Sequence, residues 1–410
     1  MRATHLLRWS AEPAPAGPPG ASPSSSRILT AALELVLEWA PAARAVFVAG
    51  SHASGTAAWV DHDGRTLSLS DVDLYVVLDD EPACRAARAR QRSARADLAR
   101  RTIGFGLAAP LEAGFHTPAG FARLPARPGT IELARHGRVI HGDARLADLV
   151  PQVGPDDVSD DEIALLLENR GCELLWCRPL LHSADPLSRL KGRHAVLKCA
   201  LDLAGVAALL GGAYPDGLAS RVAWAKAHRP AASDAREEAE VRDLDRLWDD
   251  CLAWREAGAS HARPASGDGE WRIAVSGWIR AFHAAAARVA PRSPVAPVDR
   301  ALALARRAPL KRRVRDALLP YGGSGPGRVE RVAFALRGTL PHRVHASAAL
   351  LLIAAGDGAL ESLPPHVARA LTTLGVVPAA ACTGLEEASR AVVRAWDRWL
   401  LDGQRTAEPA

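Results

Sequence analysis

Two apolar runs with polar ends constrain the fold of this chain more than any other feature. Residues 46–51 read VFVAGS, so an apolar run ends in a Gly-Ser pair, and residues 69–78 read LSDVDLYVVL. Short runs of this kind, rich in β-branched residues, are typical of buried strands. Side chains alternate between the two faces of a strand, so Asp71 and Asp73 project to the same side. The sequence therefore predicts a sheet in which two carboxylates face one point.

This arrangement has a chemical implication. Two ionised carboxylates that face one point repel each other unless a divalent cation lies between them. A turn made by Gly50 and Ser51 can offer backbone N–H groups and a hydroxyl to a phosphate. A metal ion beside a phosphate is the arrangement used for phosphoryl and nucleotidyl transfer. The alternative is a sheet edge with two solvated aspartates in a turn.

The residues GSHASGT at 50–56, followed by SDVDL at 70–74, resemble the signature of the DNA polymerase β-like nucleotidyltransferase superfamily. The resemblance covers about residues 26–150 and is closest to bacterial single-chain members, which include aminoglycoside nucleotidyltransferases and minimal nucleotidyltransferases. It implies transfer of a nucleoside monophosphate from an NTP to an acceptor, with Mg²⁺ held by Asp71 and Asp73. The segment between Ser51 and Asp71 is longer than is typical of the family, because a hairpin is predicted around Asp61.

A third carboxylate from an adjacent strand usually completes a two-metal site of this kind. Glu112 is the candidate, because its apolar neighbours in PLEAGF suit a strand. The family more often has Asp at this place, and some members use a Glu as general base. We therefore expect Glu112 to ligate the metal or to deprotonate the acceptor, with a solvent-facing side chain as the alternative. The resemblance further implies that Gly50, Ser51 and Ser70 bind the nucleotide.

Positive charge for the triphosphate is expected from a helix at residues 187–210. Lys191, His194 and Lys198 are spaced at i, i+3 and i+7, so they share one face of this helix. Lysine is rare in a chain that almost always uses arginine. In similar enzymes a lysine of the helical domain reaches the phosphates, so we expect Lys198 to bind the nucleotide. The alternative is a solvated amphipathic face.

The pattern of apolar residues changes near residue 150 and predicts an α+β fold. Before this point short strands and helices alternate, as expected for a nucleotidyltransferase domain with a small mixed sheet flanked by helices. After about residue 155 the pattern is mainly helical. We expect five regions, which are a flexible segment (1–25), the catalytic domain (26–150), a helical domain (151–292), a further helical domain (293–403) and a tail (404–410).

The composition is that expected of a cytoplasmic protein. Of 410 residues, 48% are hydrophobic and 24% charged, and the net charge is +5 at pH 7. No signal peptide and no apolar run of membrane-spanning length are present, so no membrane partner is expected. Arginine supplies the positive charge along the whole chain, so nucleic acid is a possible partner but not the favoured one. The six cysteines are scattered, without zinc-ligand or disulfide spacing, and are expected to be reduced core residues.

The sequence therefore predicts a Mg²⁺-dependent nucleotidyltransferase that uses an NTP and releases pyrophosphate. The favoured acceptor is a hydroxyl of a small molecule or an antibiotic. One alternative is nucleotidylation of a protein or tRNA, and another is a nucleotide-binding regulatory protein without turnover. Retention of two mutually repelling carboxylates favours an enzyme, because a binding module would not need them. The sequence leaves the NTP and the oligomeric state open.

Overall fold

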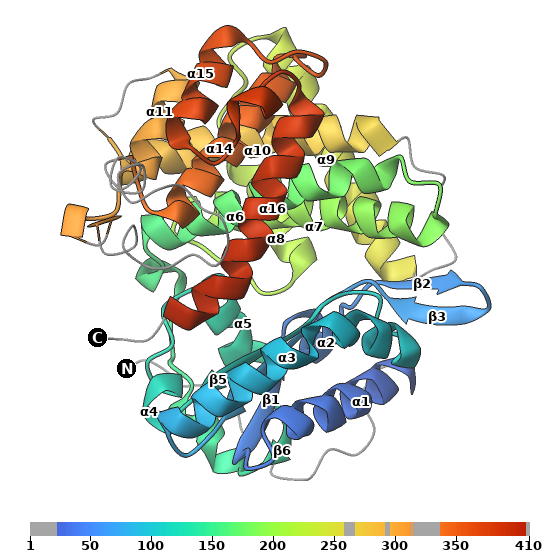
Figure 1. Ribbon diagram of the computed structural model, residues 1–410. Coiled ribbons are helices and arrows are strands. Elements are labelled where there is room, and N and C mark those ends of the chain that lie inside the picture. The colour runs from blue at the N-terminus through green and yellow to red at the C-terminus, as the bar shows by residue number, and fades with distance from the viewer. Residues whose placement is uncertain (1–22, 258–266, 292–295, 312, 315–336, 407–410) are drawn as a thin grey trace, which may run out of the picture. The chain divides into compact units, whose positions relative to one another are not determined.

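The computed structural model of this chain describes residues 23–257, 267–291, 296–311, 313–314 and 337–406. The chain divides into two compact units, which we describe one at a time. Unit 1 comprises Met1–Val158 and Ala253–Arg263, and unit 2 comprises Ser159–Leu252 and Pro264–Ala410. The described strands all lie in unit 1, and unit 2 is helical (Figure 1). The expectation of an α+β fold with a helical C-terminal region is confirmed.

The centre of unit 1 is a mixed sheet. Within the described residues its strand order is β5-β4-β1-β6. Strand β4 is parallel to β5 and antiparallel to β1, and β1 is antiparallel to β6. The two apolar runs of the sequence form the central strands, β1 and β4. The strands are β1 (Ala45–Ala49), β4 (Val72–Val77), β5 (Leu111–His116) and β6 (Arg138–Gly142).

Helices cover both faces of this sheet. On one face, α1 (Pro23–Trp39) and α3 (Glu81–Phe105) lie side by side and pack on alternate residues of β1 and β4, such as Val48 and Leu74 (Figure 1). The other face carries Phe47 and a smaller core. This core includes residues of three short helical segments, α4 (Pro118–Phe121), α5 (Pro128–His136) and η1 (Ala144–Leu149), and a further short segment, η2 (Pro155–Asp157), follows them.

A short helix and a separate hairpin connect β1 to β4. The helix is α2 (Gly50–Ser54), and the hairpin pairs β2 (Trp59–His62) with β3 (Arg65–Ser68). Asp63 and Gly64 form its turn with φ angles of 49° and 71°. Positive φ at both central residues is the requirement of the tight hairpin turn that an Asp-Gly pair favours. The predicted hairpin therefore exists, and it lies between Ser51 and Asp71.

Unit 2 is built around α6, α7, α10 and α14, which pack against one another. The sequence pattern predicts that the tryptophans of the helical region are packing residues. Trp176 is 40% exposed, but Trp248, Trp271 and Trp278 are buried. Their indole N–H groups donate to backbone carbonyls of neighbouring helices, at 2.6 to 2.8 Å. The helices are α6 (Asp160–Leu181), α7 (Pro186–Leu210), α8 (Leu218–His228), α9 (Ala235–Ala257, which continues into unit 1), α10 (Gly267–Val289), α11 (Pro297–Ala305), α14 (Leu340–Gly356), α15 (Pro365–Leu374) and α16 (Leu385–Thr406), with a short η4 (Ala379–Ala381).

Several helical boundaries differ from the sequence-based expectations. The sequence pattern predicts one helix over 296–320, but α11 ends at Ala305, residues 306–309 are not helical, and residues 310–311 and 313–314 are helical again. The remainder of this helix beyond 314, and most of a further helix that the pattern predicts at 327–338, lie outside the described residues. Helices on both sides of residue 292, where a domain boundary was expected, belong to unit 2. Part of the expected tail is helical, because α16 continues to Thr406. Residues 1–22 of the expected flexible segment are also outside the described ranges.

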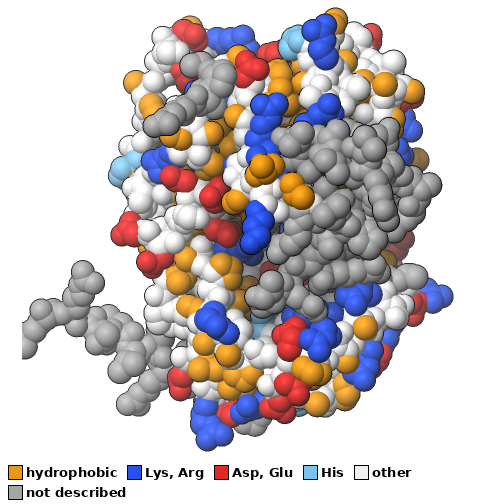
Figure 2. All heavy atoms as spheres, turned by 60° about the vertical axis from the view of Figure 1, so that its left-hand side comes forward, with side chains coloured by type: hydrophobic (Ala, Val, Ile, Leu, Met, Phe, Trp, Pro, Cys, Tyr) orange, Lys and Arg blue, Asp and Glu red, His pale blue; other side chains and the backbone are white. Residues whose placement is uncertain are grey.

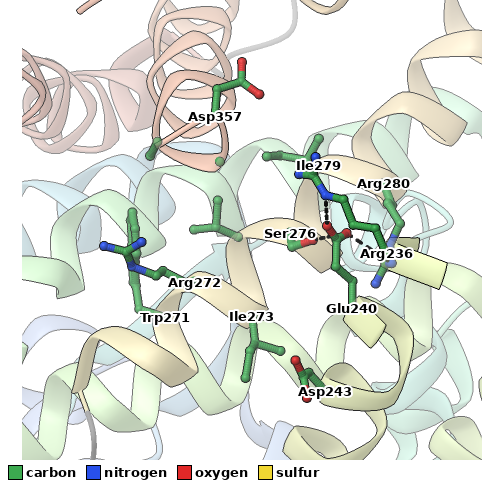
Figure 3. A pocket seen from close by; sticks show the side chains of 13 residues that line it. Arg236, Glu240, Asp243, Trp271, Arg272, Ile273, Ser276, Ile279, Arg280 and Asp357 are labelled. Atoms are coloured by element: carbon green, nitrogen blue, oxygen red, sulfur yellow. Dashed lines mark hydrogen bonds and ion pairs between the residues drawn. The ribbon is translucent and has the colours of Figure 1, made fainter. Parts of the chain in front are cut away.

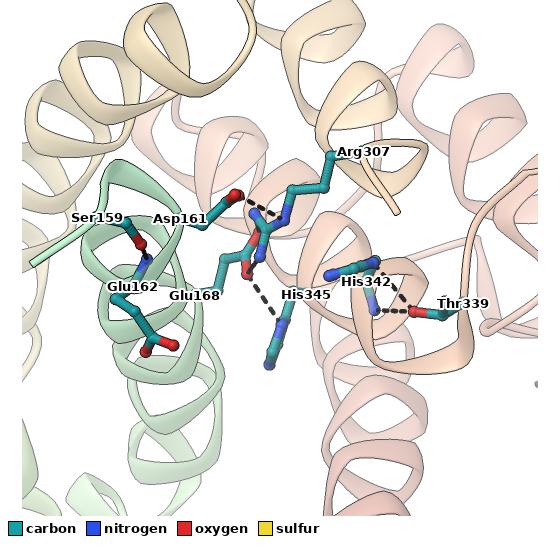
Figure 4. Close-up of polar contacts among 8 residues, drawn as sticks. All are labelled: Ser159, Asp161, Glu162, Glu168, Arg307, Thr339, His342 and His345. Carbon is teal, nitrogen blue, oxygen red and sulfur yellow. Dashed lines mark hydrogen bonds and ion pairs between the residues drawn. The ribbon is translucent and has the colours of Figure 1, made fainter. Parts of the chain in front are cut away.

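A buried ion cluster joins three segments of unit 2 (Figure 4). Arg307, which follows α11, donates from both terminal nitrogens to the two carboxylate oxygens of Glu168 on α6, at 2.7 and 2.8 Å. Nδ1 of His345 on α14 lies 3.2 Å from Glu168 Oε2. Burial opposes ionisation, but the adjacent His345 and Arg307 lower the pKa of Glu168 to about 2. Glu168 is therefore an ionised carboxylate with 3% exposure, compensated by its two partners.

The surface and the cysteines agree with the composition. Lys and Arg side chains are interspersed with Asp and Glu on the described part of the face shown in Figure 2, and they do not gather into one basic patch on that part. All six cysteines are buried and free, as expected of reduced core residues. Within the described ranges, no helix combines the length and the apolar character needed to cross a membrane.

Candidate functional site

The predicted carboxylates lie at one edge of the sheet in unit 1. Asp71 directly precedes β4, and Asp73 is paired in register with Glu112 of the parallel strand β5. On the other side, Asp73 is paired with Ala49 at the end of β1. Register partners share a face of a sheet, so Asp73 and Glu112 project to the same side. Asp71 and Asp73 are partly buried and Glu112 is exposed. The structure thus places all three residues where two adjacent strands begin.

The Gly-Ser turn lies directly against one of these carboxylates. Gly50 has a φ of +66°, and a Cβ atom at this position would lie 2.6 Å from Oδ2 of Asp73. Glycine is the residue that accommodates both this backbone conformation and this close approach. The hydroxyl of Ser51 is buried and has no hydrogen-bond partner among the described residues. An unpaired buried hydroxyl is unfavourable, and a ligand at this turn that bonded to Ser51 Oγ would remove this cost.

Ser70 is held differently from Ser51. It is 1% exposed, and its hydroxyl accepts hydrogen bonds from Ala58 N at 2.8 Å and from Arg255 Nη1 at 3.4 Å. The same Arg255 nitrogen donates to the carbonyl of Thr56 at 2.6 Å. These bonds fix the loop that leads into Asp71. Contact between Ser70 and a nucleotide stays a prediction.

Tyr75, with its partners His116 and Arg127, is a neighbour of these carboxylates that the sequence did not single out. Tyr75 is two residues after Asp73, and its ring stacks on His116, with the ring centroids 5.8 Å apart. Burial and the negative charges of Asp73 and Glu112 raise the pKa of Tyr75 to about 12, and Arg127 at the start of α5 opposes this rise. Tyr75 is therefore a neutral phenol close to both carboxylates. The i, i+2 spacing from Asp73 could have identified it, whereas no local pattern points to Arg127.

The donor set fits Mg²⁺ bound together with a substrate. In the part of the chain that the structure describes, no group of three or more His, Cys, Asp or Glu side chains is arranged to hold a metal ion by itself. Mg²⁺ is commonly bound by one or two carboxylates together with phosphate oxygens and waters. Asp71 and Asp73 supply such a pair, and the Gly50 turn lies next to them. Metal ligation by Glu112 stays a prediction.

The predicted phosphate-binding lysine belongs to unit 2. On α7, Lys191 and Lys198 are partly buried and His194 is 7% exposed. Burial lowers the pKa of Lys191. This face is therefore more buried than the solvated face considered as the alternative. Binding of nucleotide by Lys198 stays a prediction, and a Lys198→Ala variant should raise the Michaelis constant for the NTP if the contact exists.

Unit 2 also contains a pocket of about 340 Å³ between α9, α10 and the end of α14 (Figure 3). Arginines and carboxylates both line it. Glu240 accepts from Arg236 Nε at 3.1 Å and from Ser276 Oγ at 2.8 Å, and Arg280 Nη1 lies 3.6 Å from it. These charges compensate one another within the wall. None of the residues predicted to form the site lines this pocket.

No family model, curated protein or solved structure matches this chain. What the site can do is therefore argued from its own residues. The paired aspartates can hold a divalent cation, the Gly50 turn with the Ser51 hydroxyl can receive a phosphate, and the exposed Glu112 can accept a proton from an acceptor.

Proposed function

We propose that this protein is a Mg²⁺-dependent nucleotidyltransferase. It would transfer a nucleoside monophosphate from an NTP to a hydroxyl of a small-molecule acceptor, with unit 1 as the catalytic unit. One observation carries the proposal: the Gly50 turn lies against the carboxylate of Asp73. Asp73 in turn is the register partner of Glu112 on the adjacent strand. A phosphate-binding turn and two carboxylate-bearing strands at one edge are what nucleotidyl transfer requires.

The proposed reaction is a displacement at the α-phosphorus. The oxygen of the acceptor hydroxyl forms a bond to this phosphorus, the bond to the bridging oxygen of the β-phosphate breaks, and pyrophosphate leaves. Mg²⁺, when bound, neutralises phosphate charge and lowers the pKa of the attacking hydroxyl. Asp71 and Asp73 would hold the metal and thereby orient the NTP, and Gly50 and Ser51 would bind the phosphate oxygens. The acceptor proton would go to Glu112.

The exposure of the carboxylates supports this division of roles. Asp71 and Asp73 are partly buried, which suits groups that hold a fixed ion, whereas Glu112 is exposed and accessible to an incoming acceptor. Tyr75, with a pKa of about 12, keeps its proton at neutral pH and can donate it in a hydrogen bond. It would stabilise an anionic oxygen at this edge without taking part in proton transfer.

The proposal and its acceptor class can be tested together. Each NTP, labelled at the α-phosphate, is incubated with the protein, Mg²⁺ and one of three acceptor pools, namely a small-molecule extract, total protein or tRNA. We expect label in the small-molecule fraction, and we expect an Asp71→Asn variant to lose it while its circular dichroism spectrum stays unchanged. Label in protein or tRNA would assign a macromolecular acceptor. Absence of transfer to every pool would overturn the proposed function.

A further inference from the structure

A buried histidine lies behind the proposed metal site. His52 is the third residue of α2, two residues after Gly50, and is 1% exposed. Its Nε2 atom lies 3.0 Å from Ser68 Oγ and 3.3 Å from the carbonyl oxygen of Ser70. Ser70 directly precedes Asp71, so a bond to its carbonyl acts on the peptide that carries Asp71. His52 thus connects the helix of the Gly-Ser turn to the loop that presents a proposed metal ligand.

The hydrogen-bond partners define the role of each ring nitrogen. Ser68 Oγ donates its only proton to the carbonyl of Ser70, at 3.1 Å. It can therefore only accept from Nε2, and the Ser70 carbonyl can also only accept. Nε2 must then carry the proton, which leaves Nδ1 as the acceptor. Ser25 Oγ lies 3.4 Å from Nδ1 and can donate to it.

The His52 ring and the His52 backbone each have a further contact. The ring meets the ring of Trp59 edge-to-face, with the ring centroids 5.8 Å apart. Arg138 Nη2 donates a hydrogen bond to the backbone carbonyl of His52, at 3.4 Å. Burial lowers the pKa of His52 to about 4, although the bond to Ser70 and the charge of Asp71 favour protonation and Arg255 and Arg138 oppose it. The neutral form with the proton on Nε2 is therefore the form present near pH 7.

From these contacts we infer that His52 is a positioning residue, which holds the Ser70 peptide so that Asp71 and Asp73 share one divalent cation. The inference rests on the proposed function. Some residues orient a metal ligand without touching the metal. Removal of such a residue typically weakens metal binding about 10- to 100-fold. No local sequence pattern indicates this role, because His52 stands out in the sequence only as a neighbour of Ser51.

The test measures binding of Mn²⁺, as a paramagnetic substitute for Mg²⁺, to the full chain by electron paramagnetic resonance, with and without an NTP. His52→Leu removes the donor and should weaken Mn²⁺ binding about 10- to 100-fold. His52→Gln can place an amide N–H near the position of Nε2 and should restore most of the affinity. His52→Asn places its amide near Nδ1 and should not. His141→Leu on β6 is the control for loss of a histidine and should bind as the wild type does.

The outcomes separate the two claims. Wild-type binding that is lost in Asp71→Asn but unchanged in His52→Leu would overturn the positioning role and leave the proposed function intact. If His52→Leu does not fold, the comparison of Gln with Asn decides, because equal affinities of these two polar variants would also overturn the inference. Absence of Mn²⁺ binding by the wild type, with every NTP, would overturn both claims.

Discussion

At the scale of single residues, the site depends on how closely the backbone approaches a carboxylate. The Asp73 carboxylate leaves no room for a Cβ atom at Gly50, so the turn and the carboxylate can approach this closely only because residue 50 is glycine. Ser51 Oγ is buried without a partner in the described part of the protein, which is a cost that a bound phosphate would remove. Both residues act through position, and small displacements should therefore affect activity more than stability.

Gly50→Ala tests this point. The new Cβ atom would be only 2.6 Å from Asp73 Oδ2, and the carboxylate or the turn must move. We expect nucleotidyl transfer to fall about 100-fold, as is typical of a misplacement of about 1 Å, and the free energy of unfolding to fall by about 1 to 2 kcal/mol from the positive φ.

Gly55→Ala, at the other end of α2, is the matched control. Gly55 has a similar φ of +76°, but nothing lies within 4 Å of a Cβ atom there. It should lose similar stability and keep its activity. Equal losses of activity in both alanine variants, measured by steady-state kinetics and urea unfolding, would mean that the contact with Asp73 is irrelevant.

At the scale of elements, the sequence located the parts with strong local signals. The strand at 45–49, the Asp-Gly hairpin and the strand of the two aspartates were predicted, because apolar runs and turn residues define them locally. Helix α8 lacks such a signal. It has only 11 residues, and its buried Arg221, which lies over the ring of Tyr214, breaks the apolar pattern. The contacts of Gly50 and His52 join distant segments, and no local pattern encodes them.

The buried ion cluster of unit 2 gives an element-scale prediction. Glu168→Gln would remove the buried counter-charge of the Arg307 guanidinium and leave it the exposed carboxylate of Asp161, 3.6 Å from its Nε. This should destabilise unit 2 by about 3 to 5 kcal/mol. Glu238→Gln, which removes an exposed partner of Arg242 on α9, should cost at most about 0.5 kcal/mol. Urea unfolding followed by tryptophan fluorescence measures both. Similar small losses in the two variants would show that the cluster does not hold α6 and α14 together.

At the scale of the whole molecule, the composition indicated that the cysteines are reduced core residues. The division of the chain into two units could be seen only in the structure. Residues 253–263 return to unit 1 after α9 begins in unit 2, and no change of composition marks this point. A lowered histidine pKa is a second property of unit 1, since burial lowers the pKa of the fully buried His52 and of the partly buried His116 from 6.5 to about 4. Their proton binding therefore couples folding of unit 1 to pH.

The sign of this coupling follows from the lowered pKa. Between about pH 6.5 and pH 4 the unfolded chain binds protons at His52 and His116 that the folded unit does not bind. The stability they contribute is fully present above pH 6.5 and is lost as the pH falls towards 4, by on the order of 2 to 3 kcal/mol for each histidine. Hydrogen exchange of the β1 and β4 amides at pH 7, 6, 5 and 4.5 measures it. His116→Gln should lose about half of the dependence, and constant protection down to pH 4.5 would contradict the account.

The central claim is that Asp71 and Asp73 form a metal-dependent nucleotidyl-transfer site with the Gly50 turn. The most direct measurement is pyrophosphate release by the purified protein with Mg²⁺, each of the four NTPs and a pooled small-molecule extract, compared with the Asp71→Asn/Asp73→Asn double variant. The account predicts release by the wild type that requires Mg²⁺ and extract and is absent from the folded double variant. Equal release by the two proteins, or none from the wild type with any NTP, would contradict it.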